Sequence, residues 1–150
     1  MKKLLYIATR PFWKPSTGHE IVMYYNCKGL YEKLGYEIYV FCFSNEIPQT
    51  EVPYFIKDVK YINTPSKFKV LDNFIKYSVV RKNKWPLQND LYYSENISKM
   101  LQEYNQIVNP QVIFLDMIRL VPYINKINSS AKKILIAEDD LAKRYERQIK

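Results

Sequence analysis

The sequence predicts an α/β fold in which helices cover both faces of a parallel sheet. Short apolar runs, typical of strands buried on both sides, alternate with longer segments whose apolar residues recur at helical spacing. The chain has 150 residues, enough for one sizeable core, and its 15% of aromatic residues argue against disorder. Its three glycines are too few for a G-x-G-x-x-G dinucleotide loop or a P-loop.

The first 43 residues predict one βαβ unit. Leu4–Ala8 is an apolar run with the length of a buried strand. A proline-containing loop follows, and Glu20 stands three residues after Thr17, as in the capping box that begins many helices. Gly35 ends this helix, because glycine adopts the left-handed C-cap conformation at little cost. Ile38–Phe43 is the second buried strand.

The remaining chain continues the alternation. Apolar runs predict three more strands, at Val59–Asn63, Val112–Leu115 and Lys133–Ala137. Helical spacing predicts four segments, at Ser66–Asn83, Gln88–Val108, Arg119–Ile127 and Asp140–Lys150. Because βαβ crossovers are right-handed, these strands predict a Rossmann-like, doubly wound parallel sheet in the order 3-2-1-4-5.

The net charge of +8 is concentrated in residues 57–84, where eight basic and two acidic residues give 8 − 2 = +6. Such a segment favours anionic partners. Within it, one helix face carries the apolar residues Phe68, Leu71, Phe74, Ile75 and Val79. Two interpretations stay open: the apolar face packs on the sheet, or the helix lies on an anionic membrane. In the second, the membrane-facing residues are Lys69, Lys76, Lys84 and Trp85.

Several classes of protein are excluded or disfavoured. With two cysteines, Cys27 and Cys42, and one histidine, the chain has neither a disulfide framework nor a metal-binding spacing, so we expect no metal. No helix-turn-helix or RNA-binding signature indicates nucleic acid. The first residues imitate a secretory signal, but their apolar core is short and Arg10 and Lys14 follow it. We therefore expect a cytoplasmic protein.

Ligands of doubly wound sheets bind outside the carboxyl ends of the strands, and three loops meet that condition. They are Thr9–His19, Asp116–Arg119 and Glu138–Asp140. These loops contain the candidate site.

The first loop offers an anion site and a base. Ser16 or Thr17 can cap the helix, and with Gly18 they place backbone N–H groups at its N-terminus, where the helix dipole favours a phosphate. His19 is a candidate catalytic base. The plainer interpretation is a helix start with one turn glycine and an exposed first-turn histidine.

The other two loops offer carboxylates beside arginines. Asp116 closes the fourth strand, where it can take a proton or orient a sugar hydroxyl, and Arg119 follows one turn later. Asp139 and Asp140 follow the fifth strand, ahead of Arg144, and are candidate substrate-binding residues. The alternative for both acidic groups is a helix cap that complements the dipole.

An ordered set of motifs gives the chain a resemblance to a known family. The stretches are Lys3–Phe12, Pro15–Gly18, Pro86–Gln88 with Tyr92–Ser94, Val112–Asp116 with Arg119–Tyr123, and Glu138–Tyr145. Together they resemble the N-terminal part of GT-B-fold glycosyltransferases, more narrowly the family-four type that builds bacterial surface polysaccharides. The family's glycine-rich loop corresponds to Ser16–His19, and Asp116 stands where many members carry a histidine.

The resemblance implies two Rossmann-like domains with the reaction in the cleft between them. Residues 1–150 match the first, acceptor-side domain, so we expect a C-terminal donor-binding domain beyond this chain. It also implies a nucleotide sugar as donor substrate, no cofactor, and a glycan or lipid-linked acceptor at the inner face of the membrane. His19 and Asp116 are the expected catalytic residues. The segment alone is expected to be inactive, because half of the catalytic arrangement is missing.

A second interpretation comes from a different class of protein. In it, the chain is a non-catalytic Rossmann-like module that binds an anionic ligand or a membrane surface. A second α/β domain downstream would favour the enzyme, and a native stop at Lys150 would favour the binding module.

Overall fold

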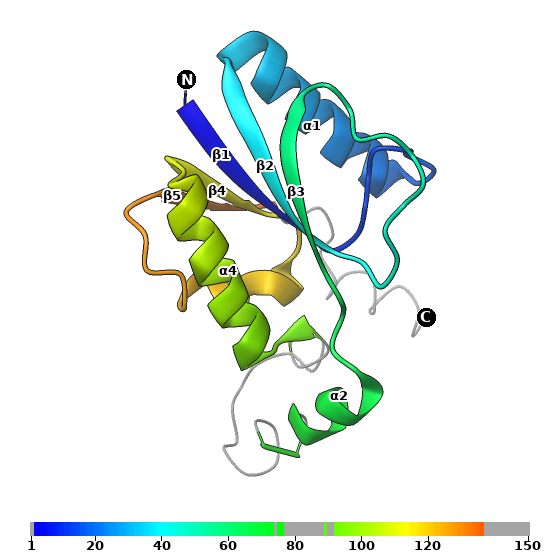
Figure 1. Ribbon diagram of the computed structural model, residues 1–150, viewed down its shortest axis with the longest axis vertical. Coiled ribbons are helices and arrows are strands. Elements are labelled where there is room, and N and C mark those ends of the chain that lie inside the picture. The colour runs from blue at the N-terminus through cyan, green and yellow to red at the C-terminus, as the bar shows by residue number, and fades with distance from the viewer. Residues whose placement is uncertain (1, 74, 77–88, 90–91, 137–150) are drawn as a thin grey trace, which may run out of the picture.

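The computed structural model describes residues 2–73, 75–76, 89 and 92–136 (Figure 1). Five parallel strands form one sheet in the order β3-β2-β1-β4-β5. They are β1 (Lys2–Ala8), β2 (Tyr36–Phe43), β3 (Ile56–Ile62), β4 (Val112–Leu115) and β5 (Lys132–Leu135). The predicted α/β class, Rossmann-like topology and strand order are confirmed.

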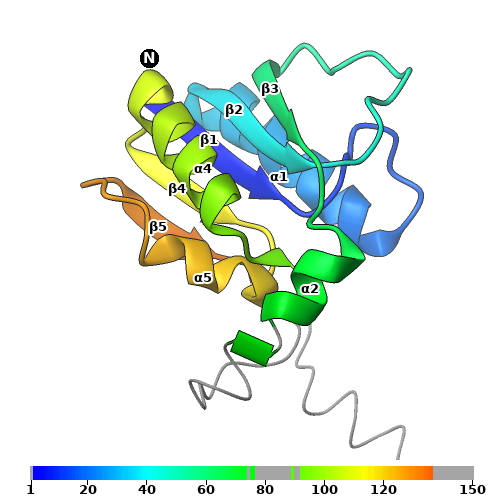
Figure 2. The same ribbon diagram turned by 60° about the horizontal axis from the view of Figure 1, so that its bottom comes forward.

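Helices cover both faces of the sheet, which divides the core into two clusters. In β1, Leu4, Tyr6 and Ala8 belong to one cluster, and Leu5 and Ile7 belong to the other. Because both sides of the strand are buried, its sequence is a continuous apolar run rather than an alternating one. One face is covered by α1 (Gly18–Leu34), and the other by α4 (Glu95–Val108) with α5 (Val121–Ile124) (Figures 1 and 2).

The ends of α1 follow the predicted chemistry. The Thr17 hydroxyl accepts a hydrogen bond from the Glu20 N–H at 3.4 Å, and the Glu20 carboxylate accepts one from the Thr17 N–H at 3.3 Å. This capping box satisfies backbone donors that the first helical turn leaves without partners. At the other end, Gly35 has φ 66° and ψ 31°. That left-handed conformation strains any residue with a Cβ atom, so glycine ends the helix there.

The second long helix begins later than the sequence predicted. We expected one helix from Gln88; Asn89 and Tyr92 are helical, and the Tyr93 N–H donates to the Asn89 carbonyl at 3.1 Å, but the helix is interrupted at Ser94 and α4 begins at Glu95. The reason lies at Ser94, whose backbone is extended (φ −148°, ψ 135°) and whose N–H donates to the Tyr123 hydroxyl at 3.1 Å. A tertiary hydrogen bond thus interrupts the helical pattern. The predicted C-terminal end is confirmed by Asn109, a C-cap with φ 50°.

The bounds of β3 and of the helix predicted after β4 also differ from those expected. β3 begins at Ile56 rather than Val59, because Ile38 of β2 extends the ladder to it. The helix predicted from Arg119 to Ile127 is split into the 3₁₀ turn η2 (Ile118–Leu120) and α5. Pro122 explains the split, since a proline in the first turn of a helix prevents the preceding turn from continuing into it. The predicted helix over 140–150 lies outside the described residues.

The helix after β3 bears on one of the two interpretations left open for its apolar face. The described part, α2 (Lys67–Asn73), does not pack on the sheet. The Phe68 side chain is 87% exposed, whereas Asn73 is buried and its side-chain N–H donates to the Tyr93 carbonyl at 2.6 Å. The helix follows an edge strand and projects beyond the sheet (Figure 2). No sheet surface therefore lies under its apolar face.

Among the described helices, none is long and apolar enough to cross a membrane.

Candidate functional site

Adjacent strands bring the first two site groups together. β1 and β4 pair with Ile7 opposite Leu115, so the residues that follow them, Thr9 and Asp116, meet at the carboxyl edge of the sheet. Asp116 is fully buried, and one of its oxygens, Oδ2, accepts hydrogen bonds from the Thr9 hydroxyl at 2.7 Å and the Thr9 N–H at 3.1 Å. These bonds compensate for removing the carboxylate from water.

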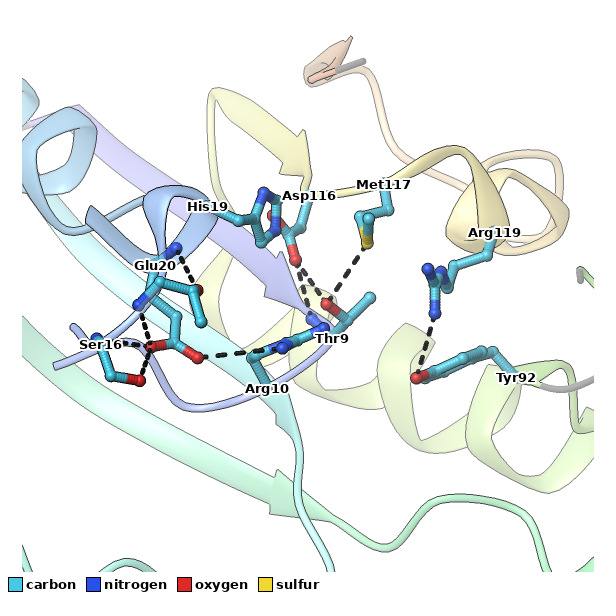
Figure 3. A network of polar contacts seen from close by, with 10 residues as sticks. Thr9, Arg10, Ser16, His19, Glu20, Tyr92, Asp116, Met117 and Arg119 are labelled. Atoms are coloured by element: carbon cyan, nitrogen blue, oxygen red, sulfur yellow. Dashed lines mark hydrogen bonds and ion pairs between the residues drawn. The ribbon is translucent and has the colours of Figure 1, made fainter. Parts of the chain in front are cut away.

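The first turn of α1 adds a histidine to this carboxylate. His19 Nε2 lies 2.8 Å from Asp116 Oδ1, and the His19 side chain is 17% exposed (Figure 3). The contact is an ion pair when the imidazole is protonated. The carboxylate stabilises the imidazolium that forms when the ring takes a proton. Sequence reasoning placed His19 and Asp116 in separate loops, and the fold makes them one unit.

The negative charge of Asp116 affects two buried thiols. Cys27 of α1 and Cys42 of β2 are both buried. Burial, reinforced by the negative charge of Asp116, raises the pKa of both thiols far above the ordinary value. Both cysteines are therefore neutral packing residues, and neither is a nucleophile at the site.

The predicted anion loop already contains an internal anion. The Glu20 carboxylate accepts hydrogen bonds from the Ser16 N–H at 2.8 Å and the Ser16 hydroxyl at 3.0 Å. Burial alone would raise the pKa of Glu20, but these bonds, the Thr17 N–H and the Arg10 guanidinium 3.9 Å away hold that pKa below its ordinary value. The loop stays open over Gly18, where an added Cβ atom would meet nothing within 4 Å.

Arg119 takes part in a different contact. Its guanidinium donates to the Tyr92 hydroxyl at 3.4 Å, and its Cζ lies 5.2 Å from the centre of that ring. Figure 3 shows this cation–π pair across the site from the pair of His19 and Asp116. Arg119 thus borders the candidate site, held by an aromatic ring, and is not a partner of the buried carboxylate.

Other predicted residues fall away from this centre or outside the described chain. The Lys69 ammonium lies 2.9 Å from Asp72, and that of Lys76 lies 3.9 Å from Glu95, so both expected membrane-facing lysines have acidic neighbours. The remaining predicted residues, Asp139, Asp140, Arg144, Lys84 and Trp85, lie outside the described residues.

Sequence reasoning gave no site role to three residues. Thr9 was placed at the carboxyl edge as the first residue of a candidate loop, but its bonds to Asp116 were not predicted. Glu20 was recognised as a helix cap, but nothing in its spacing showed that it also binds Ser16. Tyr92 appeared only within a family motif, and its contact with Arg119 depends on tertiary packing.

Within the described residues, no group of three or more His, Cys, Asp or Glu side chains gathers as metal ligands would. No protein-family model and no curated protein matches the chain by sequence.

Proposed function

We propose that this chain is the acceptor-side domain of a GT-B-fold glycosyltransferase. It would help to move a sugar from a nucleotide-sugar donor to a glycan or lipid-linked acceptor at the cytoplasmic face of the membrane. The observation that carries the proposal is the contact of 2.8 Å between His19 and Asp116 at the carboxyl edge of the sheet. Both residues lie next to or within the segments that resemble the family, and ligands of this fold bind at that edge.

The pair has the chemistry that the acceptor needs. As the acceptor hydroxyl oxygen forms its bond to the anomeric carbon, the bond from that carbon to the donor phosphate breaks, and the hydroxyl proton must go to a base. His19 is the catalytic base in this proposal, and the proton goes to its imidazole. Asp116 is a positioning residue, because it orients that ring and stabilises its positive form.

The donor phosphates have a place beside this base. The N-terminus of α1 carries the positive end of the helix dipole, and the space over Gly18 lets a ligand approach the backbone. Because Glu20 already binds Ser16, this loop supplies only part of the donor site. We propose that a following domain holds the rest of the donor, as the family resemblance implies.

The test uses the protein encoded by the complete reading frame that contains this chain. Purified protein is incubated with a panel of nucleotide sugars and a bacterial lipid extract, and nucleoside diphosphate release and sugar incorporation are measured. We expect His19→Ala and Asp116→Asn each to lower kcat by about 10²–10⁴-fold. His19→Ala should also abolish the acid limb of the pH profile. Asp58→Asn is the matched control, because that carboxylate lies on β3 and accepts a hydrogen bond from the Tyr104 hydroxyl of α4 at 2.6 Å.

Two outcomes would overturn the proposal. One is that the protein transfers sugar and that His19→Ala and Asp116→Asn have the rate and pH profile of the wild type, as the control Asp58→Asn does. The other is a complete reading frame without a donor domain, whose product binds inorganic phosphate and transfers no sugar. The second outcome would instead support the non-catalytic anion-binding module.

A further inference from the structure

The apolar face of α2 is exposed. Phe68 and Leu71 of α2, and Ile75 two residues after it, are spaced three and four residues apart and are 87%, 57% and 49% exposed. Apolar residues at this spacing share one side of a helix, which normally faces a core. Here the residue that attaches the helix to the domain is Asn73, through its bond to the Tyr93 carbonyl. An apolar stripe thus faces outward on a helix fixed by its opposite, polar side.

The surroundings of this stripe are positively charged. Residues 57–76 contain five lysines and two aspartates, which gives 5 − 2 = +3. Lys67 and Lys69 stand on either side of Phe68 in the sequence, about 100° around the helix in opposite directions. Although Lys69 lies beside Asp72 and Lys76 beside Glu95, both lysine side chains remain more than 40% exposed. The stripe is therefore bordered by ammonium groups that can reach solvent.

The position of α2 relates it to the candidate site. β3 leads into α2 at the carboxyl edge of the parallel sheet, the edge at which Thr9, His19 and Asp116 lie. Figure 2 shows α2 projecting beyond the strands in that direction. A surface docked on α2 would therefore lie on the side of the molecule where the strands end and the site is found.

We propose that the exposed face of α2 docks on an anionic lipid membrane. Phe68, Leu71 and Ile75 would enter the interface, and the flanking lysines would contact lipid phosphates. A protein partner is the weaker fit, because three side chains are far fewer than the 20–30 residues, about 800 Å², that each partner of a stable interface contributes. The proposal stands apart from glycosyl transfer, since vesicle binding requires neither donor nor acceptor.

The experiment is co-sedimentation of the full chain with vesicles of phosphatidylcholine, with and without 30% phosphatidylglycerol, at roughly 0.1 M and 1 M salt. We expect binding to the anionic vesicles at low salt only. Phe68→Ser should lower the partition coefficient about tenfold, because one large apolar side chain no longer enters the interface. Lys67→Gln should lower it about fivefold. Circular dichroism confirms that each variant is folded.

Ile107→Ser is the matched control. Ile107 is a comparably exposed apolar residue, 77%, but it lies at the end of α4 that precedes β4, at the opposite edge of the sheet. Its substitution should leave vesicle binding unchanged. The proposal is overturned if the wild type binds neither vesicle, which would leave α2 to a protein partner. It is equally overturned if Phe68→Ser and Ile107→Ser bind as wild type does, or if the lipid charge makes no difference.

Discussion

Two corners of the carboxyl edge reverse the usual distribution of polar and apolar groups in opposite ways. Beyond β1 and β4, the charged residue Asp116 is fully buried, and beyond β3 the apolar residue Phe68 is almost fully exposed. The first reversal is compensated inside the chain by Thr9 and His19. The second has no compensation within the described residues. The buried charge at the first corner thus has its partners within the chain. The exposed apolar side chain at the second corner is buried only when another surface docks on it.

The strongest test of this contrast is the removal of the buried carboxylate. Asp116→Ala leaves the Thr9 N–H without an acceptor and takes away the carboxylate that faces His19. The Thr9 hydroxyl keeps its weak acceptor, the Met117 sulfur at 3.8 Å. We expect a loss of about 3–5 kcal/mol in the free energy of unfolding, the range for breaking a buried charge pair. Urea unfolding followed by circular dichroism measures it. A loss below roughly 0.5 kcal/mol, the level of an ordinary surface substitution, would show that water solvates the Asp116 carboxylate and that its contacts with Thr9 and His19 do not stabilise the fold.

These corners also show what the sequence could predict. The strand order followed from local patterns, because the runs at Leu4–Ala8 and Val112–Leu115 carry the signature of strands buried on both sides. His19 and Asp116 were found as separate candidates from their places after strands. Their contact could not be predicted, because it depends on the register between β1 and β4 and on the entry angle of α1.

The failure of one of the two interpretations of α2, packing on the sheet, has a physical cause as well. Helical periodicity identifies which residues share a face, and it says nothing about whether a surface lies opposite that face. Because β3 is the edge strand and the helix leaves the sheet, Phe68 and Leu71 have no strand to pack on. Similarly, the start of α4 was shifted by the Tyr123 hydroxyl, a partner distant in sequence from Ser94.

A milder test addresses the loop beside the buried carboxylate. Glu20→Gln keeps the shape of the cap but removes the charge that accepts bonds from Ser16. We expect a loss of about 1 kcal/mol at neutral pH, measured by urea unfolding. Because the folded-state pKa of Glu20 lies below its ordinary value of 4.5, its contribution is fully present above that value. It is lost as the pH falls through the folded-state pKa.

The pH dependence provides the control for this variant. Wild type and Glu20→Gln should differ by about 1 kcal/mol at pH 7 and converge as the pH falls through the folded-state pKa of Glu20, because the wild-type carboxyl is then protonated. A difference that stays constant across this range would mean that the ionisation of Glu20 does not contribute to the stability of the loop.

The smallest expected effect is on the free energy of unfolding when the exposed Phe68 side chain is removed. In the absence of lipid, Phe68→Ser should change the free energy of unfolding by less than about 0.5 kcal/mol, because an exposed side chain that makes no core contact contributes little to the folded state. Phe12→Ser is the reference, since that ring is fully buried in the cluster under α1 and its loss should cost about 3–5 kcal/mol. Both are measured by urea unfolding of the same chain. If Phe68→Ser instead costs 1 kcal/mol or more, a segment of the chain itself covers the stripe in solution. The α2 corner would then be self-contained like the corner at Asp116, and the membrane would have to displace that segment before docking.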